Sequence, residues 1–430
     1  MLTSRIPVLL FLVFIFACNA KKESQDIQPL AEKYVRLGLT IGNYDSDFVD
    51  AYYGPDSLKP AAVADTSRKL PVDSLLDAVQ QLSNELNEFT TGEHSLRATW
   101  MQQQLKAFHR RIRIVSGDYG RFDEEAFDLF GVVPPRYDEA HFKGLLSRLD
   151  SLLPGEGDVT TRYHAFAKKF IIPKDKIDTI FKTAILEARK RTLDRFELPV
   201  NENFRMEYVT GKSWSGYNWY QGNYQSLIQI STDIDIFIER AIDLACHEGY
   251  PGHHVYNMML EKNLFRDKGW TEISLYPLFS PQSLIAEGSA NYGIQLAFPG
   301  STAMEYARDV LLPVAGMDTT GVSFYFEALA LRAKLNYARN EVARGLLEGT
   351  MDESEAMRWL TTYNLFTPEL AKKSLSFIRK YRSYVINYNY GLDLVKKYIA
   401  EQSKDDDDRW RVFEELLSNP VMAKDLEKSK

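Results

Sequence analysis

Apolar residues recur at three- to four-residue spacing along most of this chain, which predicts a mainly α-helical protein. Prolines and glycines mark helix boundaries: Pro134-Pro135 interrupts one helical stretch, and a Pro-Gly-Glu-Gly loop occupies 154–157. Thr367 is a predicted N-cap, because Pro368 follows it at the first helical position. The clearest helical segments are 72–89, 94–115, 138–152, 175–196 and 323–347.

One region breaks the helical pattern and predicts a small β element. Residues 214–224 are rich in aromatic residues, Gly and Asn, and residues 226–232 alternate apolar and polar side chains as a short strand does. Asp233 is then the predicted N-cap of a helix over 234–260. The aromatic segment is either part of a binding site or a cap packed over the core.

The first seventeen residues have the pattern of a signal peptide. A positively charged start precedes an apolar run over 7–17, which is too short to span a membrane. The run ends at Ala17-Cys18, which resembles a bacterial lipoprotein box with Cys18 as the lipidated residue. We expect an exported lipoprotein of the cell envelope, anchored in the membrane through Cys18, with residues 18–28 as a tether. The alternative is a plain signal peptide with an incidental cysteine.

Composition adds two expectations. The chain has 430 residues, of which 45% are hydrophobic and 26% charged, as in ordinary globular proteins. A break near 198–200 predicts an N-terminal helical lobe over 29–200 and a catalytic helical lobe over 201–430, with a substrate cleft between them. The net charge of −7 and the lack of a long basic stretch argue against nucleic acid as a partner. The sequence does not indicate an oligomeric state.

The most informative segment is HEGYPGHH at 247–254. It resembles the zinc-hydrolase motif H-E-x-x-H, in which two histidines one helical turn apart bind the metal and the glutamate is the general base. The position four after His247 is Pro251, which cannot bind a metal. On a regular helix, His253 and His254 lie too far around or along the axis to join His247. Pro251-Gly252 can absorb the two extra residues, because proline breaks the helical hydrogen bonding and glycine tolerates a bulge. His253 is therefore the first candidate for second ligand, and His254 the alternative.

A third ligand and a base complete the predicted site. Glu287 is the one acid in a helix of small, uncharged residues over 283–292, and burying such a carboxylate is unfavourable without a cation. Two histidines and a glutamate with an open fourth position are typical of a catalytic zinc site. Glu248 follows His247 directly, where it would take a proton from the attacking water. One Zn²⁺ ion is the expected cofactor.

Four segments together resemble a widespread bacterial family that has the signature HExxPGHH and is labelled as a domain of unknown function. This family is similar to helical zinc metallopeptidases, including thermostable carboxypeptidases of the Taq type. The resemblance covers most of the mature chain and implies a mainly α, zincin-like metallopeptidase fold with a small β element next to the metal helix. It also implies the ligands and base named above, but no substrate. The segments are HEGYPGHH at 247–254, AEG at 286–288, DAYYGP at 50–55 and YNYG at 388–391.

Substrate-binding residues are less strongly indicated. Tyr388 and Tyr390 are candidates for stabilising the oxyanion, although such tyrosines are more often core residues. Arg382, or its neighbour Arg379, is a candidate for binding a substrate carboxylate, which would make the enzyme a carboxypeptidase.

The short strand adds two further candidates. In many zinc peptidases an edge strand beside the metal helix pairs with the substrate backbone, so Gln229 and Ser231 are candidates for holding an extended substrate.

These observations predict a zinc-dependent hydrolase, first of all a metallopeptidase acting on a peptide or a small amide. One alternative is an amidase or esterase with a non-peptide substrate. The other is a non-catalytic surface-binding lipoprotein with a structural metal, in which the aromatic segment 214–224 grips a peptide or glycan.

Overall fold

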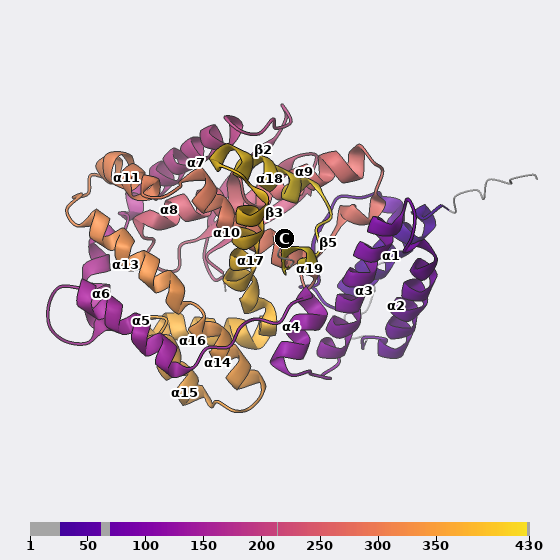
Figure 1. The fold of residues 1–430 in the computed structure, drawn as a ribbon, viewed down its shortest axis with the longest axis horizontal. Helices are drawn as coiled ribbons and strands as arrows, with labels where there is room; N and C mark the ends of the chain where they lie inside the picture. Colours follow the sequence, from indigo (N-terminus) through magenta and orange to yellow (C-terminus); the bar gives the residue numbers. More distant parts are fainter. Residues whose placement is uncertain (1–25, 62–68, 213, 428–430) are drawn as a thin grey trace, which may run out of the picture.

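The computed structural model describes residues 26–61, 69–212 and 214–427, and within them the protein is mainly helical, as predicted (Figure 1). The signal peptide and Cys18 lie outside the described residues. In the first part of the chain the elements are α1 (Gln28–Gly42), β1 (Val49–Tyr52), α2 (Val72–Leu86), α3 (Ser95–Val115), α4 (Phe122–Phe130), α5 (Glu139–Leu152), α6 (Val159–Ala167) and α7 (Ile177–Leu193).

The second part of the chain begins with a small sheet and continues as helices. Its elements are β2 (Asn203–Val209), β3 (Gly216–Gly222), β4 (Gln225–Ser231), α8 (Ile238–Leu244), the π-helical turn η5 (Ala245–Gly249), α9 (His253–Leu260), β5 (Leu275–Pro277), α10 (Pro281–Ala297), α11 (Thr302–Tyr306), α12 (Leu312–Ala315), α13 (Val322–Leu335), α14 (Ala338–Leu347), α15 (Glu353–Thr362), α16 (Pro368–Tyr381), the 3₁₀ segment η9 (Arg382–Tyr388), α17 (Tyr390–Gln402), α18 (Asp406–Ser418) and α19 (Ala423–Glu427).

Most predicted helices form close to the expected positions. The helix over 94–115 is α3, and Thr367 caps α16 by accepting a hydrogen bond from the backbone N–H of Leu370. The segment 323–347 is an exception, because it forms two helices, α13 and α14, separated by Asn336 and Tyr337. The period of apolar residues continues across this junction, so periodicity alone does not reveal it.

The predicted strand is present as β4, but it is not an edge strand. In the three-stranded sheet the order is β2-β4-β3, so β4 pairs on both sides: in parallel with β2 and antiparallel with β3. The expectation of a free edge on this strand was therefore wrong. Alternation of apolar and polar residues reports which face of a strand is buried, but not whether its edges are paired.

A two-stranded sheet joins distant parts of the chain. β1 pairs antiparallel with β5, with Val49 opposite Pro277 and Tyr52 opposite Leu275. This pairing brings an early segment of the chain beside the helix α10 that follows β5. The division into lobes at residue 200 stays a prediction.

Helix α10 lies near the middle of the molecule, with α1, α2 and α3 at one end and α5, α6 and α13 at the other (Figure 1). Most of its residues are buried, including those on the side opposite Glu287. Its close neighbour is α17: a Cβ on Gly288 would lie 2.4 Å from the carbonyl oxygen of Gly391. The two glycines allow the helix backbones to approach closely. This contact brings the AEG and YNYG segments side by side in space. It also places the chain just before α17 beside Glu287.

One buried acid away from the metal-ligand cluster gives a prediction about stability. Glu239 of α8 accepts a hydrogen bond of 2.9 Å from the hydroxyl of Tyr325, and burial, with the nearby charge of Asp243, raises its pKa to about 7 from 4.5. The carboxyl group of Glu239 therefore holds its proton more tightly in the folded protein than in the unfolded chain. The penalty for burying Glu239 is absent below pH 4.5, grows as the pH rises to 7, and is then constant.

Replacing Glu239 with Gln should remove this penalty. The difference in free energy of unfolding between E239Q and the unmutated protein should increase by roughly 2 to 3 kcal/mol from pH 5 to pH 8, in favour of E239Q. Urea unfolding of both proteins at the two pH values measures this difference. A difference that is the same at both pH values would contradict the prediction.

Candidate metal centre

The helix that carries the histidines ends and restarts within the motif. The backbone N–H of Tyr250 donates to the carbonyl of Ala245 at 2.9 Å, and that of Gly252 donates to Cys246 at 2.9 Å. The first of these bonds is a π-type bond, which accommodates an extra residue in a helical turn. The peptide between Tyr250 and Pro251 is cis, and α9 begins at His253. The predicted helix over 234–260 is therefore interrupted rather than bulged.

Gly252 is required at this break because its backbone lies against the end of the preceding helix. A Cβ at this position would lie 2.0 Å from the carbonyl oxygen of His247 and 2.3 Å from that of Cys246. The nearest atoms are all backbone atoms of the preceding turn, so no flexible side chain can move aside. The lack of a side chain at residue 252 therefore allows the chain to pass close to this turn just before His253, which lies beside His247.

Replacing Gly252 with Ala should destabilise the protein by about 3 kcal/mol, because the added methyl group overpacks a backbone contact. If the three predicted ligands hold zinc, the variant should also bind less of it, because His253 follows directly. Urea unfolding and elemental analysis measure the two effects. Gly144→Ala is a matched control, since its Cβ would meet nothing within 4 Å. Equal stability and zinc content in both variants would contradict this role of Gly252.

Three predicted ligands converge in the structure. The Nε2 atoms of His247 and His253 are 3.1 Å apart, and Oε2 of Glu287 lies 3.2 Å from the first and 3.6 Å from the second. Within the part of the chain that the structure describes, these residues form the one cluster of three or more potential metal-binding side chains. Glu287 reaches it from α10, and the two histidines come from the two sides of the helix break.

Neighbouring side chains orient two of these ligands. The amide nitrogen of Asn291 donates to the carbonyl of Tyr388 at 3.0 Å, so its oxygen faces Nδ1 of His247 at 3.1 Å. A carbonyl oxygen only accepts, and Nδ1 of His247 must therefore carry the proton, which leaves the lone pair of Nε2 directed at the cluster. The hydroxyl of Tyr384 donates to Oε1 of Glu287 at 2.9 Å. The other carboxylate oxygen of Glu287, Oε2, faces the two histidines.

The residues present fit a divalent cation. Oε2 of Glu287 is buried and accepts no hydrogen bond within the described residues, although it lies between two imidazoles. Burial opposes its ionisation, but the neighbouring imidazoles of His247 and His253 outweigh burial and hold the pKa of Glu287 well below its usual range. Burial also disfavours the charged form of His253, yet Glu287 raises its pKa to about 9. The cluster thus attracts positive charge, and two imidazole nitrogens with one carboxylate oxygen suit zinc.

A cavity of about 450 Å³ opens onto the cluster. Glu248 lines it beside His247, and its backbone carbonyl accepts a hydrogen bond of 2.7 Å from Asn218 of β3. Asp50 of β1 also lines it and accepts a hydrogen bond from the hydroxyl of Tyr217. Burial raises the pKa of Asp50 to about 6, against the lowering effect of that hydrogen bond. Apart from Asp50, the lining residues lie between 214 and 388, in the part of the chain predicted as the second lobe.

The alternative ligand His254 points away from the cluster. Its Nδ1 lies 2.8 Å from the hydroxyl of Ser226, and its Nε2 lies 3.1 Å from Oε2 of Glu202. Glu202 also accepts hydrogen bonds from Tyr250 and Arg189. Both nitrogens of His254 are therefore occupied in a buried network under the small sheet, and the structure places His253 beside His247 instead.

The predicted substrate-binding residues are mostly elsewhere. Arg382 donates to both carboxylate oxygens of buried Glu125, at 2.7 and 2.9 Å, and Arg379 is paired with Glu353 at the surface. The hydroxyl of Tyr390 lies 3.4 Å from Glu427. None of these predicted residues lines the cavity, whereas the predicted Tyr388 does.

The two candidates on β4 also bond outside the cavity. The side chain of Gln229 bonds to Trp219 and Glu207, and the hydroxyl of Ser231 donates to Asp233. Because β4 is the central strand, its backbone is already paired with the neighbouring strands on both sides.

Sequence reasoning did not assign roles to three residues of the site: Asp50, Asn291 and Tyr384. A usable signal existed for Asn291, which is four residues after Glu287 and hence on the same face of α10. Tyr384 belongs to a tyrosine-rich stretch in which periodicity does not distinguish core from site. Asp50 depends on the pairing of β1 with β5, which no local pattern reveals.

Comparison with known proteins supports the fold only. No protein-family model and no curated protein matches the chain. The structure is similar to the crystal structure of the "putative lipoprotein" from Colwellia psychrerythraea, with a TM-score of 0.51 and 14% identity over 82% of this chain and 69% of that chain. It is also similar to Trypanosoma cruzi metallocarboxypeptidase 1, with a TM-score of 0.40 and 12% identity over 93% of this chain and 90% of that chain.

Proposed function

We propose that this protein is a zinc-dependent hydrolase that cleaves peptide bonds. The observation that carries this proposal is the convergence of His247, His253 and Glu287 at the wall of a cavity that Glu248 also lines. A structural zinc site has four protein ligands that enclose the ion. Here the described residues supply three, and the cavity gives a substrate access to the place where they meet.

His247, His253 and Glu287 would hold the ion, and a zinc ion bound by such a set polarises a carbonyl group and lowers the pKa of water. Glu248 is the general base in this proposal. Its carboxylate takes a proton from the attacking water and returns it to the nitrogen of the leaving amine, so that it ends in its starting ionisation state. The hydrogen bond from Asn218 to its backbone fixes the position of this residue relative to β3.

Tyr388 is the proposed donor to the oxyanion. Its hydroxyl lines the cavity and makes no hydrogen bond within the described part of the chain. Burial and the nearby charge of Glu287 raise its pKa well above the usual range. It therefore keeps its proton at neutral pH and can donate a hydrogen bond to developing negative charge.

Strand β3, rather than β4, is the proposed element for holding the substrate backbone. It is an outer strand of its sheet, and its first residues line the cavity. At Gly216 a Cβ would lie 2.9 Å from Oε1 of Glu248, so the backbone of β3 passes directly beside the proposed base. An extended peptide that adds to an outer strand gains main-chain hydrogen bonds and a fixed register.

We also propose attachment to the cell envelope through a lipid on Cys18, which rests on the sequence of the first eighteen residues. Within the residues that the structure describes, no helix is long and apolar enough to cross a membrane.

The decisive experiment combines elemental analysis of the purified chain with a cleavage assay on a peptide library, with and without a chelator. One zinc per molecule and cleavage that the chelator abolishes would support the proposal. Zinc with hydrolysis of esters or other amides, but not of peptides, would change the substrate class. Ligand binding without any cleavage, unaffected by the chelator, would contradict an enzymatic function.

A further inference from the structure

Arg339 of α14 lines the same cavity without an anionic partner. Among the described residues, no hydrogen bond or ion pair reaches its guanidinium group, and its buried Nε is left without a partner. Its charge instead lies over the ring of Phe377, 4.6 Å from the centroid. Burial lowers its pKa, as expected for a cation that lacks an anion.

The four arginines that are buried within the described residues are each paired with an acid. Arg97 donates to Glu272, Arg111 to Asp45, and Arg382 to Glu125, each through two nitrogens. Burying a charge without such a partner is strongly unfavourable. An arginine that faces a cavity in this state is therefore a candidate for binding an anion that enters the cavity.

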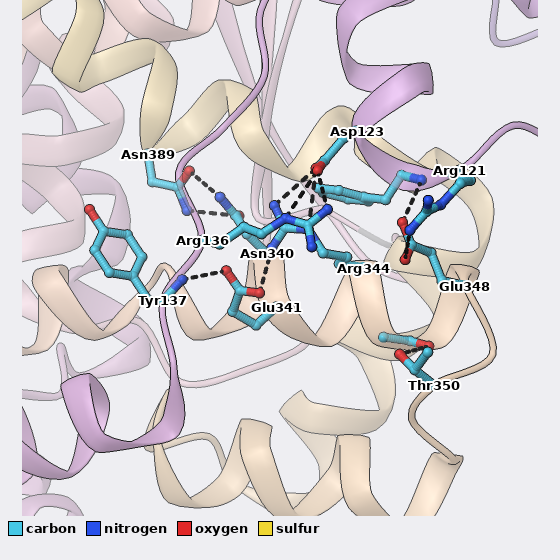
Figure 2. Close-up of polar contacts among 12 residues, drawn as sticks. Arg121, Asp123, Arg136, Tyr137, Asn340, Glu341, Arg344, Glu348, Thr350 and Asn389 are labelled. Carbon is cyan, nitrogen blue, oxygen red and sulfur yellow. Dashed lines mark hydrogen bonds and ion pairs between the residues drawn. The ribbon is translucent and has the colours of Figure 1, made fainter.

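The helix that carries Arg339 is also held in place by Asn340, Glu341 and Arg344, whose polar contacts are drawn in Figure 2. Arg344 donates to Asp123 at 3.1 and 3.2 Å and also pairs with Glu341, which accepts a 3.0 Å hydrogen bond from the backbone of Tyr137. Asn340 exchanges amide hydrogen bonds with Asn389, at 2.9 and 3.0 Å, on the residue just before α17. These contacts fix the helix beneath Arg339.

Helix α16 forms the adjoining wall of the cavity. Its lining residues recur at helical spacing, so that one face of the helix is turned to the cavity. Within this face Ser374 has a buried hydroxyl oxygen without a hydrogen-bonding partner, and Lys373 adds a second positive charge. The residues of this face are Leu370, Lys373, Ser374, Phe377 and Tyr381.

Arg339 and Ser374 line the same cavity as the clustered His247, His253 and Glu287. A molecule with a hydrolysable bond at the cluster can therefore extend a charged group toward Arg339 within one cavity.

We propose that Arg339, with the hydroxyl of Ser374, binds a carboxylate of the substrate. A guanidinium matches the two oxygens of a carboxylate and forms paired, charge-assisted hydrogen bonds with it. The apolar residues of α16 would pack against the side chain that adjoins this carboxylate. The carboxylate is either the α-carboxylate at the C-terminus of a peptide or that of an acidic side chain. This inference rests on the proposed hydrolase function and adds a substrate class to it.

Calorimetric titration tests the proposal with four small probes. N-acetyl-phenylalanine and its amide compare a terminal carboxylate with a neutral end, and N-acetyl-aspartic acid amide and N-acetyl-asparagine amide do the same for a side chain. In at least one pair, the acid should bind more tightly than its neutral partner. The pair that shows this difference identifies whether the site binds a C-terminal carboxylate or an acidic side chain. In Arg339→Met, that acid should bind about 10- to 100-fold more weakly, with the neutral probe unchanged.

Two controls separate this role from others. Titrations are done with zinc and after chelation, because a carboxylate can also bind the metal; the loss caused by R339M should persist without zinc. Arg308→Met removes an equal charge from the surface and should change nothing. Thermal unfolding should show R339M as stable as the unmutated protein or more so, since it removes an unpaired buried charge.

The outcomes are distinct from those of the hydrolase test. Equal binding of acid and neutral probes, no binding of any probe, or undiminished acid binding by R339M would overturn the proposal, even in an active peptidase. Acid binding that depends on Arg339 in a protein that cleaves nothing would instead contradict the hydrolase function and leave the carboxylate site standing.

Discussion

Replacing Glu248 with Gln should lower kcat/KM for a cleavable peptide by about 10³-fold, since general-base catalysis contributes 10²–10⁴ to enzymatic rates. Gln has nearly the same shape as Glu but cannot accept a proton from water at neutral pH. Glu248 is not one of the three clustered ligands, so the zinc content should stay at that of the unmutated protein. Its backbone hydrogen bond to Asn218 does not involve the carboxylate and should survive.

The matched control is Glu239→Gln, which makes the same chemical change in the same helical region. Glu239 bonds to Tyr325 and does not line the cavity. Its variant should retain kcat/KM within about twofold, because no interaction with the reacting groups is lost. Elemental analysis and initial-rate kinetics on all three proteins measure both quantities. If E248Q keeps normal hydrolysis, the role assigned to Glu248 is wrong.

Replacing Glu287 with Gln should weaken zinc binding by more than about 100-fold, because even changes to residues that only orient the ligands reduce metal affinity 10- to 100-fold. The variant retains the size and one oxygen of the side chain, but it loses the negative charge that faces the two histidines. Hydrolysis should disappear together with the metal. Competition with a zinc-binding dye gives the affinity, and the circular dichroism spectrum reports whether the fold is kept.

Tyr384→Phe provides a graded comparison for this prediction. It removes the hydrogen bond to Oε1 of Glu287 but keeps the carboxylate. Its zinc affinity should fall by about tenfold, at the lower end of the range for orienting residues. If E287Q binds zinc as tightly as Y384F, then Glu287 is not a ligand and the site must be reassigned.

Much of the site was predictable because its chemistry is local. Glu287 is the one charged residue in a buried helix of otherwise uncharged residues, and that conflict by itself indicates a cation. Glu248 directly follows His247, so its place beside the predicted ligands needs no long-range information. The sequence could not decide between His253 and His254, because the two residues are adjacent. Only the structure shows which of the two side chains points toward His247.

Other errors of prediction have a common physical cause. The sequence of β4 shows its buried face, but pairing on both edges depends on where β2 and β3 arrive. Arg382 and Arg339 look alike as sequence positions. Only the structure shows that a buried Glu125 neutralises the first and that no described acid neutralises the second.

The sequence alone determined the mainly helical class, the clustered histidines with Glu248 beside them, and the acid on α10, because helical periodicity and the cost of a lone buried carboxylate act over a few residues. The tertiary structure decided which histidine meets His247, how Asp50 and Tyr384 reach the site, and which arginine faces the cavity. These depend on the direction of the chain after Gly252, on the pairing of β1 with β5, and on the close contact of α10 with α17. The pairing of β1 with β5 and the contact of α10 with α17 join residues far apart in sequence, and no local pattern encodes them. The direction of the chain after Gly252 depends on how its backbone lies against the preceding turn, which the pattern of apolar residues does not show.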